Sequence, residues 1–192
     1  MKPAFLITEG KSDQLVLRSL LPKETVKRLK MVAGNGRYSA ISQTESILAM
    51  GGRPVAVVVD ADTSAVRAVE ELREMLQFGL RQAASGTPYL LRIAVPEIEF
   101  LLLSDERDIL ALTHKEPDSK YETCYAREHP KQYLQEKFPA LAKNYIAALP
   151  EFLAALPASV KERARKSEFI QGLVAFTEKV SNVGAAPALQ GR

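Results

Sequence analysis

The strongest constraint on the fold is an uninterrupted apolar run, PVAVVV, at residues 54–59. Its β-branched side chains favour a strand, and an apolar run without polar alternation is typical of a parallel sheet covered on both faces. The run leads directly into Asp60-Ala61-Asp62. We therefore expect a buried parallel strand with acidic residues at its carboxyl end.

Shorter apolar runs predict three more strands, at residues 4–8, 29–33 and 89–95. Between the strands, apolar residues recur at spacings of three and four, most clearly over residues 66–80, which predicts intervening helices. Strands that alternate with helices favour parallel pairing through right-handed crossovers. The sequence therefore predicts an α/β fold in which helices flank a four-stranded parallel sheet.

Three helix starts can also be predicted. Residues 12–13 offer an N-cap for the first helix, and one of residues 62–64 offers an N-cap for the long helix after the third strand. Pro96 suits the first turn of a further helix, which would carry Glu97 and Glu99.

After residue 104 the β-branched runs end, and helical patterns separated by prolines take over. We expect helices at residues 106–112, 130–138, 140–156 and 159–180. The predicted domains are a sheet-based core at residues 1–104, a helical appendage at residues 105–183 and a flexible tail at residues 184–192.

The composition narrows the class of protein. With 46% hydrophobic and 26% charged residues, the chain is typical of globular proteins and not of disordered or collagen-like ones. Its single cysteine, Cys124, excludes an intrachain disulfide, and neither a signal peptide nor a membrane-spanning run is evident. We expect a cytoplasmic protein without membrane contact. The net charge of +3 permits a nucleic-acid partner without requiring one.

Acidic side chains follow three of the four predicted strands: Glu9 follows the first, Asp60 and Asp62 the third, and Glu97 and Glu99 the fourth. The carboxyl ends of parallel strands meet at one edge of a sheet, where ligands bind. Carboxylates gathered there repel one another unless a cation lies among them, and Mg²⁺ prefers oxygen ligands. We therefore expect a metal site that serves chemistry on phosphate, although Asp62 alone is explained equally well as a helix cap.

Two stretches around these acidic residues resemble a known family. FLITEGKSDQLVLRSLL and the later VAVVVDADTSAVRAVEEL are similar to the Toprim domain of topoisomerases, bacterial primases, RecR-type repair proteins and overcoming-lysogenisation-defect (OLD) nucleases. The Toprim signature, Glu-Gly after the first strand and Asp-X-Asp after the third, is matched by Glu9-Gly10 and Asp60-Ala61-Asp62. The forms EGKSD and VPEIEFLLL most resemble OLD-type and small stand-alone Toprim proteins. The resemblance covers residues 4–104 and implies a Rossmann-like Toprim catalytic core.

The resemblance implies cleavage or joining of nucleic acid with Mg²⁺ or Mn²⁺, by a one-metal or two-metal mechanism. The chain is too short for a topoisomerase or a primase, so a nuclease remains. The implied metal ligands are Glu9, Asp13, Asp60, Asp62, Glu97 and Glu99. Asp60 and Asp62 would hold one ion, and Glu9 would bridge the ions or act as a base. Asp13 and a glutamate, Glu99 or failing that Glu97, would hold the second ion.

OLD-like nucleases also use a lysine from beyond the sheet. Lys131 is the matching candidate for a catalytic lysine, and Lys11 is its rival. Lys11 and four cationic residues of the helical region are the expected nucleic-acid contacts, although a solvated helix face explains those four equally well. The four residues are Lys161, Arg163, Arg165 and Lys166.

Two functions stay open. The first is a nuclease for DNA or RNA, acting as an anti-phage effector with a separately encoded ABC-type ATPase, since OLD proteins carry a fused ATPase that this chain lacks. The second is a non-catalytic Toprim scaffold of the RecR type, which binds nucleic acid or a partner protein. A homodimer is compatible with both functions.

Two further signals each have two interpretations. Gly34-Asn35-Gly36 predicts a turn after the second strand, and this turn would lie near enough to the acidic edge to help hold a phosphate. Tyrosines interleaved with basic residues between Lys120 and Tyr145 suit either stacking on single-stranded bases or the core of the helical region.

Overall fold

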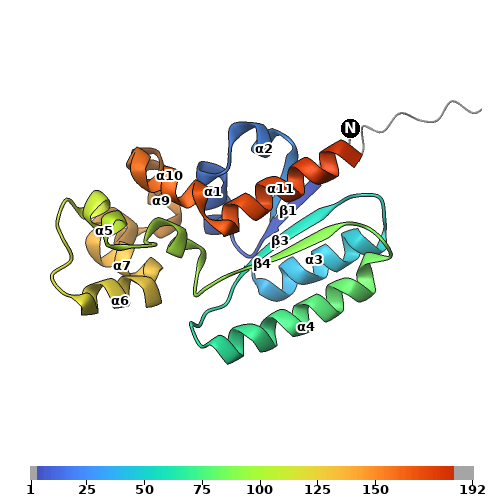
Figure 1. Ribbon diagram of the computed structural model, residues 1–192, viewed down its shortest axis with the longest axis horizontal. Helices are drawn as coiled ribbons and strands as arrows, with labels where there is room; N and C mark the ends of the chain where they lie inside the picture. Colours follow the sequence, from blue (N-terminus) through green and yellow to red (C-terminus); the bar gives the residue numbers. More distant parts are fainter. Residues whose placement is uncertain (1–3, 184–192) are drawn as a thin grey trace, which may run out of the picture.

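The computed structural model describes residues 4–183 and has an α/β fold, with helices on both faces of a four-stranded sheet (Figure 1). The strands are β1 (Ala4–Thr8), β2 (Leu29–Ala33), β3 (Val55–Asp60) and β4 (Tyr89–Ala94). Their order is β2-β1-β3-β4, and all three pairings are parallel. The predicted fold class and all four predicted strands are therefore confirmed. The predicted tail at residues 184–192 lies outside the described residues.

The uninterrupted apolar run at residues 54–59 forms an inner strand. β3 lies between β1 and β4, and Val55 to Val59 are almost completely buried. Side chains alternate between the two faces of a strand, so a run without polar residues requires cover on both faces. The two core clusters divide this strand accordingly, with Ala56 and Val58 in one and Val55, Val57 and Val59 in the other.

One face of the sheet is covered by α3 (Arg37–Ala49) and α4 (Val66–Ala84), which run side by side (Figure 1). Leu48 of α3 and Leu76 and Leu80 of α4 pack in the same cluster as Ile7 of β1. The burial of these side chains supplies the hydrophobic stabilisation of this layer.

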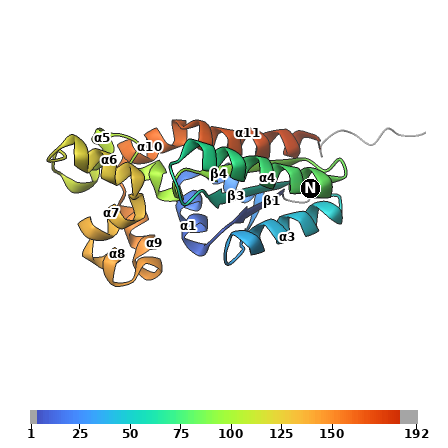
Figure 2. The same ribbon diagram turned by 90° about the horizontal axis from the view of Figure 1, so that it is seen from below.

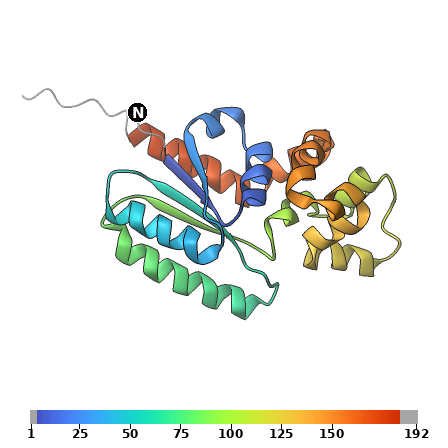
Figure 3. The same cartoon turned by 180° about the vertical axis from the view of Figure 1, so that it is seen from behind.

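The other face is covered by α1 (Lys11–Leu20), α2 (Lys23–Lys27) and α11 (Glu168–Val183). The last of these returns from the helical region and contacts β1, β4 and α2. Figures 2 and 3 show its ribbon running back along the sheet. Ile170 and Leu173 of α11 belong to the same buried cluster as Leu6 of β1 and Leu17 of α1. Within the described residues, strands occur only before the predicted boundary at residue 104. Side chains from both sides of this boundary nevertheless pack in one hydrophobic core.

The remaining helices lie beyond the carboxyl edge of the sheet (Figure 1). They are η1 (Ile98–Leu102), α5 (Glu106–Thr113), α6 (Lys120–Glu128), α7 (Pro130–Lys137), α8 (Pro139–Lys143), α9 (Tyr145–Ala155) and α10 (Ala158–Lys166). This set of elements, η1 to α10, is called the helical lobe below. Within the described part of the chain, no helix is long and apolar enough to span a membrane.

The predicted helix starts were wrong. Gly10, not residues 12–13, is the N-cap of α1, and Asp13 accepts a hydrogen bond from its N–H at 2.7 Å. α4 begins after Ala65, without a side-chain cap. No α-helix starts at Pro96, because its carbonyl accepts the N–H groups of residues 61 and 62 and so ties the end of β4 to the end of β3. Only the short 3₁₀ helix η1 follows it.

Two of the predicted helices are each divided by a polar residue. Asn144 ends α8 and caps α9, since its side chain accepts the N–H of Ala147 at 3.2 Å. Ser167 separates α10 from α11, and its hydroxyl donates to the carbonyl of Ala164 at 2.6 Å. Such side-chain bonds to the backbone compete with a continuous helix. Helices α2 and α6 were not predicted.

Candidate active site

Acidic residues from several elements surround Asp60, the last residue of β3. The negative charges of Asp13, Glu99, Glu9 and Glu97 all raise the pKa of Asp60, in that order of influence. Parallel pairing explains this arrangement, because it brings the carboxyl ends of β1, β3 and β4 to one edge. This group of five carboxylates is called the acidic edge below.

Asp60 is the member of the acidic edge that has a buried oxygen without a hydrogen-bond partner among the described residues. Burial, followed by the four neighbouring negative charges, raises its pKa to about 9. Its Oδ1 atom is buried and has no hydrogen-bond partner among residues 4–183. Buried polar atoms are nearly always paired, so a buried unpaired oxygen among like charges indicates a position where a cation would be stabilising.

Glu9 lies directly beside Asp60. Its Oε2 atom accepts a hydrogen bond from the Asp60 N–H at 3.3 Å. Burial raises the pKa of Glu9, while the positive charge of Arg37 and this hydrogen bond oppose the shift. Glu9 is therefore positioned by the sheet and is electrostatically coupled to its neighbours.

Asp13 is buried in the first turn of α1. One of its oxygens accepts the N–H of Gly10, and the other accepts the hydroxyl of Ser12 at 2.9 Å. Asp13 therefore stabilises the start of the helix, and its charge also acts on Asp60. Its oxygens have further lone pairs, so these bonds leave it able to ligate a cation.

Glu99 is 1% exposed, and burial raises its pKa to about 7. The hydroxyl of Tyr145, from α9, donates to its Oε1 atom at 2.6 Å, and the charge of Lys131 also favours its ionised form. Burial and the nearby carboxylate of Glu99 raise the pKa of Tyr145. Sequence reasoning did not single out Tyr145 for this role, because it stood out only as one of several aromatic residues in the helical region.

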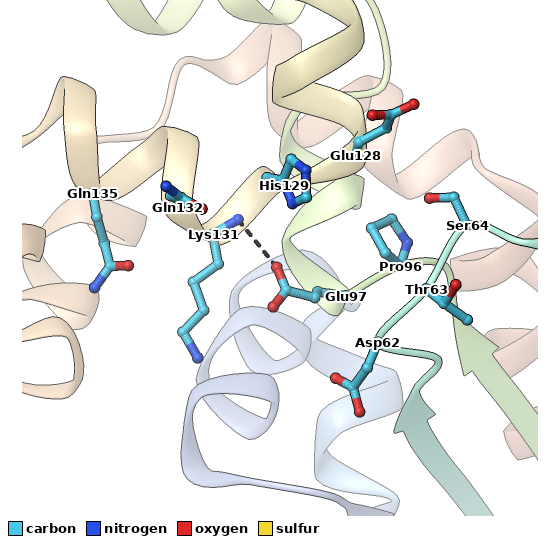
Figure 4. Close-up of a pocket in the computed structure, with 10 residues that line it drawn as sticks. All are labelled: Asp62, Thr63, Ser64, Pro96, Glu97, Glu128, His129, Lys131, Gln132 and Gln135. Atoms are coloured by element: carbon cyan, nitrogen blue, oxygen red, sulfur yellow. Dashed lines mark hydrogen bonds between the residues drawn. The ribbon is translucent and has the colours of Figure 1, made fainter.

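Lys131 lies beside both glutamates after β4. Its backbone N–H donates to Glu97 at 3.3 Å, which Figure 4 marks with a dashed line. Its ammonium nitrogen lies 5.0 Å from the centre of the Tyr145 ring, which is favourable as a cation–π contact. The rival candidate, Lys11, donates to Gln14 at 2.8 Å. The structure therefore places Lys131 beside Glu97 and Glu99, and its catalytic role stays a prediction.

Asp62 lies at the rim of the site and is exposed. Its carboxylate pairs with the guanidinium of Arg37, whose Nε atom lies 3.6 Å from Oε2 of Glu9. Arg37, the first residue of α3, was not predicted as a site residue. Its only sequence signal is its position directly after the Gly34–Gly36 turn.

The carboxylates are close together but not already arranged as a metal centre. Over residues 4–183, no group of three or more His, Cys, Asp or Glu side chains is arranged to hold a metal ion. The donor set nevertheless fits a hard divalent ion, because all its atoms are oxygens and one of them, Asp60 Oδ1, is buried without a partner.

A hollow of about 440 Å³ adjoins the acidic edge (Figure 4). Asp62 and Glu97 line its side nearest the sheet, and His129, Lys131 and Gln135 line the side formed by α7 and its N-cap. Its size is that of a small-molecule site. Since this lining combines carboxylates, one lysine and neutral polar groups, it suits an uncharged polar group better than a phosphate.

The four predicted nucleic-acid contacts of α10 all have partners within the protein. Arg163 pairs with the completely buried Asp108 of α5, with its Nε atom 2.6 Å from Oδ1. The other three donate to Leu20 O, Ala154 O and the exposed Glu162: they are Arg165, Lys161 and Lys166, respectively. Arg163 therefore joins α10 to α5. The phosphate role of all four residues stays a prediction.

No protein-family model matches the chain, and no curated protein or solved structure matches it significantly. The structure itself defines an α/β fold with a group of carboxylates, two of them buried, around the carboxyl end of β3.

Proposed function

We propose that this protein is a nuclease that depends on Mg²⁺ or Mn²⁺ and hydrolyses phosphodiester bonds of DNA or RNA. The observation that carries the proposal is the environment of Asp60, whose buried Oδ1 atom has no partner among the described residues and whose charge is opposed by four carboxylates. Strongly raised carboxyl pKa values cluster at functional sites. The Toprim resemblance, which rests on the same residues, supports the proposal.

Asp60, Glu9 and Glu99 would hold the cation, with Asp13 and Glu97 as further oxygen donors. When bound, such an ion lowers the pKa of an attacking water and stabilises the departing oxygen. Asp60 must lose its proton before it can ligate, so a pKa of about 9 in the cation-free protein makes binding tighter as the pH rises.

The remaining groups position the reactants. Tyr145 fixes the orientation of Glu99 through the 2.6 Å hydrogen bond, and the ammonium group of Lys131 supplies a positive charge near the acidic edge. The adjoining hollow offers room for an uncharged part of the substrate, such as a base, while the phosphate lies over the carboxylates. The lining of the hollow combines charged and uncharged groups. It therefore suits nucleic acid, which has charged phosphates and uncharged bases, better than a substrate that is charged throughout.

A non-catalytic scaffold is the second candidate function. It is favoured by Arg37, which already pairs with Glu9 and Asp62 and so reduces the charge of the acidic edge without a metal. A separately encoded ABC-type ATPase and a homodimer stay predictions under either function.

The deciding experiment measures Mn²⁺ binding by calorimetry and cleavage of single-stranded and duplex DNA and RNA, for the unaltered protein, Asp60→Asn and Glu74→Gln. Glu74 is an exposed carboxylate of α4 and serves as the control. We expect cleavage and binding in the unaltered protein and in the control, and neither in Asp60→Asn. Tight nucleic-acid binding with no Mn²⁺ binding would favour the scaffold, and Mn²⁺-dependent cleavage retained by Asp60→Asn would contradict the assigned site.

A further inference from the structure

The guanidinium of Arg37 bridges two acidic residues that follow different strands. Its Nε atom lies 3.6 Å from Glu9 Oε2, and a terminal nitrogen contacts Asp62 Oδ2. Its side chain is 24% exposed, so it is largely enclosed by the site. The Nε atom is buried, yet it makes no hydrogen bond to any residue that the structure describes. The contact with Glu9 is thus an ion pair without a well-formed hydrogen bond.

The loop after β2 holds Arg37 in this place. The N–H groups of Gly34 and Gly36 donate to the carbonyls of Thr8 and Glu9 at 2.8 and 2.9 Å, which attaches the loop to the end of β1. A Cβ atom on Gly34 would lie 2.6 Å from Cα of Ala40, and Gly36 has φ +112°, so both positions favour glycine. These two N–H groups are therefore occupied within the fold, and what the loop brings to the acidic edge is the arginine.

A divalent cation can displace Arg37 from its carboxylate partners, because the ion pairs of Arg37 are weak. Asp62 is mostly solvated, and an exposed ion pair contributes little stability. Arg37 and a divalent cation would both be attracted to Glu9. While Arg37 neutralises part of the charge of this carboxylate, the attraction between Glu9 and the divalent cation is weaker. The positive charge of Arg37 therefore competes with a cation bound at Glu9.

We propose that Arg37 is an internal substitute for the divalent cation, which leaves the carboxylates when the cation binds and then contacts a phosphate of the substrate. This inference rests on the proposed metal-dependent function. The planar guanidinium binds phosphate oxygens in the same two-pronged manner as carboxylates, so the displaced group finds an equivalent partner in the incoming nucleic acid. The backbone of Arg37 stays fixed at the start of α3, so only its side chain needs to move.

The test compares Mn²⁺ affinities without nucleic acid, measured by calorimetry on the unaltered protein, Arg37→Gln and Arg67→Gln. Arg67 is a matched control, because it also pairs with a carboxylate, Glu71, but is 93% exposed on α4. We expect Arg37→Gln to bind Mn²⁺ about tenfold more tightly than the unaltered protein, a change of about 1.4 kcal/mol. Arg67→Gln should bind like the unaltered protein.

A second arm tests the phosphate contact. In saturating Mn²⁺, Arg37→Gln should bind single-stranded nucleic acid more weakly, and its dependence of log affinity on log salt should be shallower by roughly 0.7, as for one lost phosphate contact. Tighter Mn²⁺ binding with unchanged nucleic-acid binding would overturn the phosphate contact.

A third measurement needs no variant. The NMR signal of the Arg37 Nε–H group in the unaltered protein should shift over the same Mg²⁺ concentrations at which Mg²⁺ binds. If the protein binds Mg²⁺ while this signal stays unmoved, or if Arg37→Gln gains no affinity for Mn²⁺, the substitute role is wrong. If the unaltered protein and Arg37→Gln both fail to bind either cation, the proposed nuclease function fails first, and this inference falls with it.

Discussion

At the scale of single residues, Asp60 makes the stability of the cation-free protein depend on pH. Its pKa is about 9 in the folded protein and 3.8 ordinarily, so between these values the folded state holds a proton that the unfolded state has released. The free energy of unfolding therefore falls as the pH rises through this window, by up to about 1.4 kcal/mol per pH unit from this group. Glu99 acts in the same direction between its ordinary pKa of 4.5 and about 7.

The first prediction is that Asp60→Asn makes the protein more stable in EDTA at alkaline pH. The amide removes a carboxylate whose ionisation opposes folding, so the gain in melting temperature should grow from near zero at about pH 4 to its maximum near pH 9. Thermal unfolding across this range checks it. A variant that is less stable than the unaltered protein at every pH would show that burial and the neighbouring carboxylates do not oppose the ionisation of Asp60.

The second prediction concerns the cation. Mn²⁺ should raise the melting temperature of the unaltered protein, and more so at about pH 8 than at about pH 6, because ligation requires loss of the Asp60 proton. Removal of Mn²⁺ with EDTA should reverse the gain. Glu9→Gln should reduce the effect and Glu74→Gln should not. A gain of equal size at both pH values would argue against ligation by Asp60.

At the scale of elements, the site is completed by the helical lobe, since η1 supplies Glu99 to the acidic edge, while α9 and α7 supply Tyr145 and Lys131. Their positions at strand ends were enough to predict that Glu9 and Asp60 lie close together, because parallel pairing fixes where the carboxyl ends of strands meet. Tyr145 could not be predicted in this way. Which turn of a helix faces Glu99 depends on tertiary packing, which the local pattern of residues does not specify.

The third prediction is that Tyr145→Phe raises the pKa of Glu99 further, because this change removes a hydrogen bond that favours the ionised form of Glu99. The pH at which Mn²⁺ binding is half-maximal should move upward, and the free energy of unfolding should fall by about 1–3 kcal/mol. Calorimetry across pH and urea unfolding measure the two effects. If stability falls while the pH dependence of binding stays unchanged, Tyr145 has a packing role only.

The fourth prediction separates structure from binding in α10. Arg163→Gln leaves the buried Asp108 without its charged partner and should lower the free energy of unfolding by about 3–5 kcal/mol. Lys166→Gln, which removes an exposed ion pair with Glu162, should change it by less than about 0.5 kcal/mol. Urea unfolding of both variants checks this. Equal losses would mean that the buried pair contributes no more than the exposed one.

At the scale of the whole molecule, the sheet could be predicted almost residue by residue, whereas the path of the final helix could not. The residues of α11 showed a helical pattern, yet nothing in that pattern indicated that this helix would pack on β1 and β4 rather than only on neighbouring helices. Such a choice depends on which apolar surfaces remain uncovered after the other elements have packed. The sheet face beneath α11 is one such surface.

The fifth prediction follows from this packing. A chain shortened to end at Ser167 lacks α11 and should expose part of the sheet face that includes Leu6, so its unfolding should lose cooperativity and it should bind hydrophobic dyes. Circular dichroism and dye fluorescence provide the measurement. A shortened chain that unfolds as cooperatively as the unshortened chain would show that α11 contributes little to the core.

The contact between α11 and β1 also affects the order of events during biosynthesis. β1 leaves the ribosome long before α11, so the part of its cover that α11 supplies, beside that of α1, does not exist until translation has passed residue 183. The nascent chain must therefore leave part of this sheet face uncovered until α11 has been made, which makes this protein a candidate for chaperone assistance. The same delay means that an unfinished polypeptide cannot complete its core, so a truncated translation product would lack the side chains of α11 that pack in the same core as Leu6 of β1.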